Sequence, residues 1–107
     1  MTRCGIVIRS RRPAQLEPWY REALGEVCLQ IEEDPTLARR STEPMRVVPN
    51  LLVDDVEGIE RRLIAMGATW RRELEVTPWG KIATVVDPDG NVVQLLERGP
   101  EGDNTWR

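Results

Sequence analysis

The sequence contains no histidine and no phenylalanine, and it has only two cysteines. Without histidine the chain cannot form a Ser-His-Asp or Cys-His nucleophile pair, or any metal motif based on imidazole. The two cysteines, Cys4 and Cys28, have neither metal-binding nor redox spacing. One disulfide would fit this count, but we interpret them as small apolar thiols of a reduced protein. No segment approaches the ~18 apolar residues of a membrane span, so we expect a cytoplasmic protein with no membrane partner.

The sequence also lacks an excess of positive charge, since 15 Lys and Arg residues face 18 Asp and Glu residues, a net charge of -3. Its arginine pairs are spread along the chain: Arg11-Arg12, Arg39-Arg40, Arg61-Arg62 and Arg71-Arg72. This distribution favours solvated helix and strand faces over a nucleic-acid stripe. No dinucleotide fingerprint, phosphate loop or nucleophile elbow is present. We therefore expect no nucleic-acid partner.

A chain of 107 residues is long enough for one domain with a small core. We expect this domain to span residues 1–97, followed by a flexible, polar tail over residues 98–107. Four tryptophans are present, Trp19, Trp70, Trp79 and Trp106, against a single tyrosine. Each indole N–H needs a partner when buried, so we expect some of them at a rim or interface. Dimerisation would help to stabilise so small a core.

The apolar pattern of the first half predicts a strand over residues 3–9, a helix from Pro13 to Leu24 that ends at Gly25, and a strand over 26–32. Residues 33–45 contain two prolines and little periodicity, so we expect a loop. The second half predicts strands over 46–53, 69–76, 80–86 and 91–97. A helix begins at the acidic stretch Asp54–Glu57, and Asp87–Gly90 forms a tight turn. The expected order is β-α-β, loop, β-α-β-β-β.

Three stretches carry a resemblance to a known family: Trp19–Gly25, Leu52–Val56, and Thr77–Gly80 taken with Asp87–Asn91. The sequence resembles the vicinal oxygen chelate superfamily, which includes glyoxalase I, extradiol dioxygenases, and fosfomycin and bleomycin resistance proteins. The resemblance implies a bacterial-type α+β fold in which paired βαβββ modules form a sheet cup. An N-module would cover about 1–45 and a C-module about 46–97. The first module would be shortened, because 26–45 cannot hold three full strands.

The same resemblance places the metal ligands of related enzymes at Gly5, Asn50 and Gln94, with a further ligand within residues 26–45. None of the three positions carries an imidazole or a carboxylate. Divalent ions in such sites need anionic oxygen or imidazole donors. We therefore expect no metal and no cofactor. A metal site would require residues from a partner chain or an unexpected set that includes Cys4.

The positions implied to line the cup predict a ligand-binding site made of Gly5, Asn50, Leu52, Trp70, Trp79 and Gln94. The resemblance implies that Asn50 and Gln94 lie together on the cup face, as two neutral amides on an apolar wall, a pattern suited to orienting a small molecule by hydrogen bonds. Alternatively, each amide serves the backbone of its neighbours. Trp79 is either a stacking platform or a plug over the sheet end. Trp70 either lines the cup or packs against the second helix.

Three functions are compatible with these residues. The first is a metal-free homodimer of the bleomycin-resistance type that binds a small molecule for resistance, sequestration or sensing. The second is a lyase, isomerase or dioxygenase-type enzyme with an unconventional divalent metal, or with acid–base catalysis by Asp54 or Glu73. Its catalytic residues are unknown. The third is a degenerate fold kept only as a dimer or partner module. The missing ligands favour the first.

Overall fold

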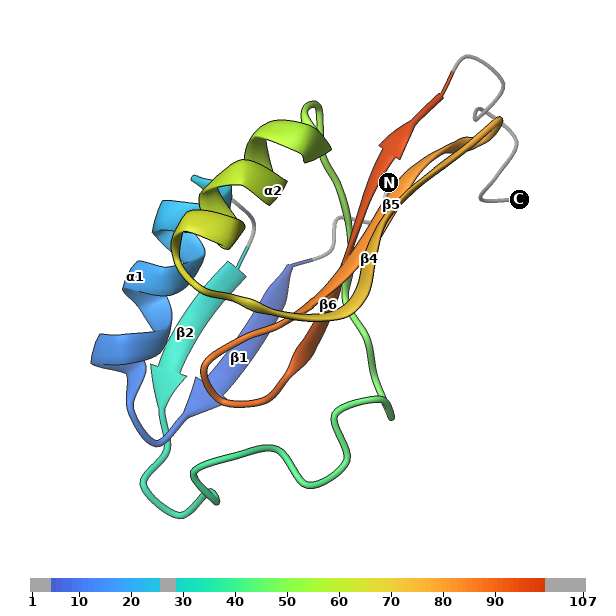
Figure 1. Cartoon of the computed structure of the whole chain (residues 1–107). Coiled ribbons are helices and arrows are strands. Elements are labelled where there is room, and N and C mark those ends of the chain that lie inside the picture. The colour runs from blue at the N-terminus through green and yellow to red at the C-terminus, as the bar shows by residue number, and fades with distance from the viewer. Residues whose placement is uncertain (1–4, 26–28, 100–107) are drawn as a thin grey trace.

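The computed structural model describes residues 5–25 and 29–99, and Figure 1 shows their arrangement. The first half contains β1 (Ile6–Ser10), α1 (Pro13–Leu24) and β2 (Leu29–Glu33); the second contains β3 (Asn50–Leu52), α2 (Val56–Ala65), β4 (Thr69–Thr77), β5 (Gly80–Val86) and β6 (Val92–Arg98). Strands β1 and β2 form a parallel pair, and the other four form a mixed sheet in the order β3-β6-β5-β4. The predicted α+β order is confirmed, with a βαβββ unit in the second half and a shorter first half.

Helix α1 follows its sequence signals closely. Pro13 stands in the first turn, where its missing N–H has no helical partner to lose. The helix ends where the N–H of Gly25 donates to the carbonyl of Arg21 at 2.9 Å, with Gly25 at φ 72°. Pro18 lies inside the helix on its exposed side. The opposite side is buried, so α1 is held by its apolar face.

Helix α2 begins one residue later than the acidic stretch alone suggested. Its N-cap is Asp55, whose Oδ1 accepts from the N–H of Gly58 at 3.0 Å. With Asp55 as the N-cap, Glu57 is the second residue of the helix and not the third, so it cannot close a capping box; its carboxylate pairs with Lys81 on β5. After the helix, Gly67 adopts φ 71°, which lets the chain turn towards β4.

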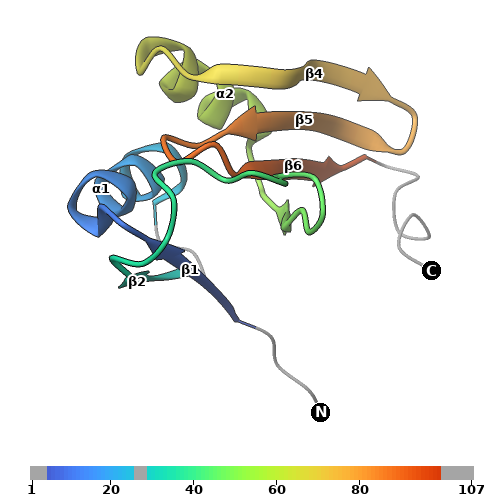
Figure 2. The same cartoon turned by 90° about the horizontal axis from the view of Figure 1, so that it is seen from below.

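One hydrophobic core joins the two halves of the chain. Helices α1 and α2 lie side by side in Figure 1 and cover the inner faces of both sheets. Figure 2 shows the two-stranded sheet beneath α1 and the four-stranded sheet beside it. The buried members of the core are Leu16, Tyr20, Ala23, Leu51, Val56, Ile59, Leu63, Val85, Val93 and Leu95. Because these residues come from both halves, the proposed N- and C-modules share a single core.

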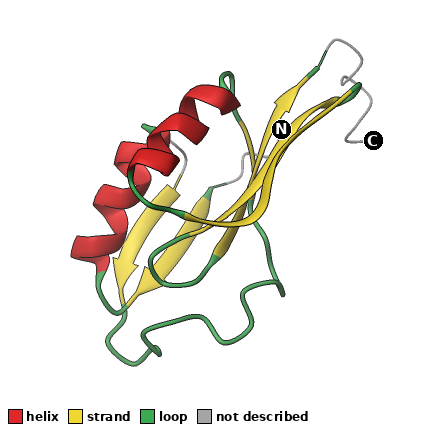
Figure 3. Cartoon of the chain, viewed as in Figure 1, coloured by secondary structure: helices red, strands yellow, loops and turns green. Residues whose placement is uncertain are grey.

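The predicted strand over 46–53 is wrong for its first part, since only Asn50–Leu52 pairs. Val47 is 78% exposed and has no strand neighbour. Pro49 lacks a backbone donor and lies just before the strand, where its carbonyl accepts from the N–H of Gln94 at 2.9 Å. The predicted loop over 33–45 is confirmed from Asp34 and continues to Pro49, as the loop colour of Figure 3 shows.

Some predictions fall on residues outside the described ranges. These are the ones that concern Cys4, Cys28, Trp106, the first part of the strand over 26–32 and the tail from residue 100. Among the helices that the structure describes, none is long and apolar enough to cross a membrane.

Candidate functional site

Two neutral amides lie next to each other on the sheet face that points away from the helices. Asn50 on β3 and Gln94 on β6 are register partners, and Nε2 of Gln94 donates to Oδ1 of Asn50 at 3.2 Å. Both side chains are half-buried. This bond uses one donor and one acceptor, so Nδ2 of Asn50 and Oε1 of Gln94 keep their own hydrogen-bonding capacity. The amides bond to each other, rather than to neighbouring backbone.

An apolar pair follows directly along the same two strands. Leu52 and Leu96 are register partners, and Leu52 is 54% exposed while Leu96 is buried. The neighbouring carboxylate points the other way: Oε1 of Glu97 accepts from the N–H of Val56 at the start of α2, at 2.9 Å. Because residues three apart on a strand face opposite sides of the sheet, Glu97 cannot replace Gln94. The outer face offers two amides beside an exposed leucine.

The structure brings together only three of the six predicted ligand-binding residues, Asn50, Leu52 and Gln94. Trp70 pairs with Val85 and packs against the core, so it lies on the sheet face opposite to Gln94. This is the alternative in which Trp70 packs towards the helices, and we do not include it in the site. Gly5 lies just before β1, which pairs with β2 and not with the sheet that carries the amides.

Trp79 lies at the tip of the β4–β5 hairpin, where its side chain is 55% exposed. Its carbonyl accepts from the N–H of Gly99 at 3.0 Å, which ties the hairpin tip to the end of β6. Gln94 faces Thr84, four residues along β5 from Gly80. At the strand rise this separates the tip from the amide pair by about 13 Å. Trp79 therefore stands at the sheet end and apart from the amides.

The residues around the amides do not fit a divalent metal. Asn50 and Gln94 offer neutral oxygens only, and Gly5 has no side chain. Within residues 5–25 and 29–99, no group of three or more His, Cys, Asp or Glu side chains could hold a metal ion. We therefore derive no chemical step through a metal.

The two carboxylates considered for acid–base catalysis have no visible partner. Asp54 and Glu73 are both exposed, and neither hydrogen-bonds or pairs with another side chain in the described part of the chain. A general acid or base is normally oriented by a neighbouring group and tuned by its surroundings. The structure gives neither residue that support.

A buried polar cluster at the β5–β6 turn was not predicted. Asp87 is 3% exposed, and its Oδ2 accepts from the hydroxyl of Tyr20 at 2.6 Å. Its Oδ1 accepts from the N–H groups of Asp89 and Asn91, each at 2.9 Å. Burial raises the pKa of Asp87 in spite of these bonds. Burial, followed by the charge of Asp87, raises the pKa of Tyr20. The cluster ties α1 to the turn.

The same turn holds β1 and the long loop. The hydroxyl of Ser10 donates to Oδ2 of Asp89 at 2.5 Å, and the carbonyl of Asp89 accepts from the N–H of Ser41 at 2.8 Å. The sequence identified Asp87–Gly90 as a turn, but a single sequence carries no signal that pairs it with Tyr20 or Ser10. The turn therefore connects β1, α1 and the long loop, and we call it the junction.

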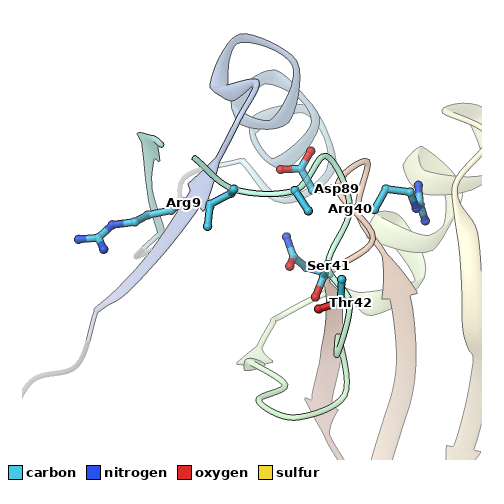
Figure 4. A pocket seen from close by; sticks show the side chains of 8 residues that line it. Arg9, Arg40, Ser41, Thr42 and Asp89 are labelled. Carbon is cyan, nitrogen blue, oxygen red and sulfur yellow. The ribbon is translucent and has the colours of Figure 1, made fainter. Parts of the chain in front are cut away.

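A pocket of about 250 Å³ lies beside this junction. It is lined by Arg9, Leu37, Ala38, Arg40, Ser41, Thr42, Asp89 and Asn91. Figure 4 shows the side chains of Arg9 and Arg40 extending in opposite directions. Arg9 lies 3.6 Å from Glu32 on β2, which partly neutralises it. The two arginines therefore do not converge on a common anion.

Comparison with known proteins identifies the fold. The sequence profile described as "Glyoxalase-like domain" matches residues 5–96. No protein with a curated functional description matches the sequence. Among solved structures, the chain is similar to a glyoxylase/bleomycin resistance protein/dioxygenase domain from Frankia sp. EAN1pec, with 16% identity, 94% of this chain and 93% of that one covered, and a TM-score of 0.78.

Two further structures have names that mention antibiotics. The fosfomycin resistance protein FosX from Listeria monocytogenes is 13% identical over 95% of this chain and 97% of that one, with a TM-score of 0.69. TnmS3, an antibiotic binding protein from Streptomyces sp. CB03234, is 19% identical over 92% of this chain and 98% of that one, with a TM-score of 0.67. At these identities the likeness establishes the fold alone.

Proposed function

Because the chain belongs to the glyoxalase-like domain family, we propose that it binds a small molecule without a metal, on the sheet face that carries Asn50 and Gln94. The observation that carries this proposal is the amide pair itself. It occupies positions where the family resemblance implies metal ligands, and Gln94 donates to Asn50 at 3.2 Å. A pair of neutral amides can orient a ligand, but it offers no negative charge to a divalent ion.

The chemistry of the pair suggests what it would recognise. Nδ2 of Asn50 supplies donors and Oε1 of Gln94 supplies an acceptor, and both residues lie on the sheet face opposite the core. A neutral ligand group that carries both a donor and an acceptor, such as an amide, would complement them. The exposed side chain of Leu52 offers apolar contact next to this group. A few placed polar atoms on an apolar wall are typical of small-molecule sites.

The names of similar structures support a role in binding rather than a particular ligand. One is called an antibiotic binding protein and another a fosfomycin resistance protein. By analogy of fold, we propose sequestration, resistance or sensing for this chain. A second copy would complete the binding face beside the exposed Leu52, so a homodimer is part of the proposal. An enzyme of the lyase, isomerase or dioxygenase type would need a donor set or a catalytic pair not found around Asn50 and Gln94.

The test is a ligand screen read out at the amides. The ¹⁵N-labelled protein is titrated with antibiotics and metabolites while the side-chain NH₂ signals of Asn50 and Gln94 are followed by NMR. A saturable shift of both signals is expected for at least one compound. Gln94→Ala should weaken that binding about tenfold. It removes the hydrogen bond from Gln94 to the ligand, and it leaves the side chain of Asn50 without the group that orients it.

Gln30→Ala is the matched control, because Gln30 is an exposed strand glutamine of the other sheet that bonds to Glu32. Its binding should equal that of the wild type. Equal affinity in Gln94→Ala and the wild type would contradict the proposal.

A further inference from the structure

The row of outward-facing side chains on β3 and β6 continues past Leu52 and Leu96. Beyond Leu52 and Leu96 the same two strands lead to Asp54 and Arg98, which line a pocket of about 390 Å³ together with Leu52, Val53 and Glu97. Leu52 thus borders both the amide pair and the pocket. The order is an amide pair and a leucine pair along β3 and β6, followed by Asp54 just after β3 and Arg98 at the end of β6.

Asp54 and Arg98 are the charged groups that the pocket can offer to a ligand. Both side chains are exposed, and neither forms an ion pair with another residue in the described ranges. The third charged group, Glu97, already has partners within the protein. Its Oε1 accepts from the N–H of Val56, and its Oε2 lies 3.6 Å from Nζ of Lys81. The pocket therefore presents one carboxylate and one guanidinium.

We propose that this pocket is the second half of the binding site, and that the ligand is an elongated molecule with an amide-type group at one end and an amino-acid-type zwitterion at the other. This proposal rests on the proposed function. The ammonium group pairs with Asp54 and the carboxylate with Arg98. The apolar middle of the ligand lies on Leu52.

The spacing along the sheet fits an extended ligand. Arg98 is four residues from Gln94 on β6, which corresponds to about 13 Å at the rise of a strand. A neutral, compact molecule could satisfy the amides, but it would leave the two charges unused.

The test uses Nε-acetyl-L-lysine, which joins a zwitterion to a secondary amide through an apolar chain. Three probes each lack one group: 6-acetamidohexanoate has no ammonium, 5-acetamidopentylamine has no carboxylate and L-norleucine has no amide. Affinities are measured from NMR shifts at Gln94 and at the backbone of Asp54 and Arg98. Nε-acetyl-L-lysine should shift all three, and loss of either charge should weaken binding about threefold, as expected for exposed ion pairs.

Variants assign the charges. Asp54→Asn should weaken only the probes that carry an ammonium group, and Arg98→Gln only those that carry a carboxylate. Glu73→Gln is the control, since Glu73 is an exposed carboxylate on β4, away from the pocket. No probe should distinguish this variant from the wild type.

The outcomes separate the two proposals. If the three amide-containing probes shift Gln94 with equal affinity and leave Asp54 and Arg98 unmoved, the amide site stands and its extension into the pocket is wrong. If probes shift the signals of Asp54 and Arg98 but none of the four shifts the signal of Gln94, both the proposed function and the two-ended site are wrong. If Nε-acetyl-L-lysine shifts none of the three, the zwitterion assignment is overturned.

Discussion

Gln94 is the residue on which the functional argument depends. A carboxylate at this position would be an anionic oxygen donor, whereas the amide is neutral and can both donate and accept. The sequence was sufficient to predict that Gln94 and Asn50 share a sheet face. It was not sufficient to predict that they bond to each other, because that depends on the β3–β6 register, which joins residues 44 positions apart.

Tyr20 allows a test of the buried cluster at the level of one residue. It is the only tyrosine in the chain, and its hydroxyl donates to Asp87 at 2.6 Å. Replacing it with phenylalanine should reduce the free energy of unfolding by about 1–3 kcal/mol, because buried Asp87 loses a donor. Urea unfolding at neutral pH measures this change.

The pH dependence of the same residue has a definite sign. Burial and the charge of Asp87 raise the pKa of Tyr20 in the folded state. The contribution of protonated Tyr20 to the free energy of unfolding is therefore complete below the pKa of the unfolded state, about 10, and is lost as the pH rises above it. Above about pH 10, wild-type stability should fall more steeply than that of Tyr20→Phe, by about 1.4 kcal/mol per pH unit. Comparing the two variants cancels the contribution of Lys81, whose pKa is also raised, chiefly by its hydrogen bond to Glu57.

Absorbance at 295 nm gives an independent measurement, since tyrosinate formation in this chain can come only from Tyr20. The folded protein should show no tyrosinate at a pH where the urea-unfolded protein is half ionised. A native titration midpoint near 10 would show that the bond to Asp87 does not form.

Among the elements, the β4–β5 hairpin depends on one glycine. Gly80 has φ 153°, and a Cβ at this position would lie 2.3 Å from the carbonyl oxygen of Glu97 on the neighbouring strand. Gly80→Ala should therefore push β5 away from β6, destabilising the protein by about 3 kcal/mol or more. Urea unfolding monitored by circular dichroism measures the loss.

Gly67→Ala is the matched control for backbone strain alone. Gly67 also has a positive φ, 71°, but no atom lies within 4 Å of the added Cβ. Its cost should be about 1 kcal/mol. Equal costs for the two variants would mean that close strand approach is not what requires glycine at position 80.

At the same scale, the sequence predicted the helices better than the strands. The ends of α1 could be predicted because Pro13 and Gly25 mark helix ends through their own backbone conformation. The strand predicted over 46–53 was mostly wrong, because strand formation requires a partner, and only Asn50–Leu52 reaches β6. Local patterns determine helix ends, whereas pairing between distant segments determines which apolar runs become strands.

For the whole molecule, the resemblance predicted the fold correctly, and the family match over residues 5–96 confirms it. The structure brings Asn50, Leu52 and Gln94 together, but not Trp70 and Trp79, which the resemblance assigned to the cup. In the structure, the β4–β5 register turns Trp70 towards the core, and the hairpin carries Trp79 to the sheet end. Neither position can be read from one sequence.

The oligomeric state is a testable property of the whole molecule. The first half contributes a sheet of only two strands, and the outer face of the larger sheet exposes Leu52. We expect a second copy to complete the binding face. Light scattering coupled to size-exclusion chromatography should give about 24 kDa, twice the 12.2 kDa of one chain. A mass near 12 kDa at every concentration tested would contradict this part of the proposal.

The central claim is that this chain binds a small molecule through Gln94 without a metal. The most direct test titrates EDTA-dialysed, ¹⁵N-labelled protein with the best compound from the ligand screen, while the side-chain amide signal of Gln94 is followed. A saturable shift is expected, with the same dissociation constant before and after EDTA treatment. Binding that disappears with EDTA and returns when a divalent metal is added would contradict it.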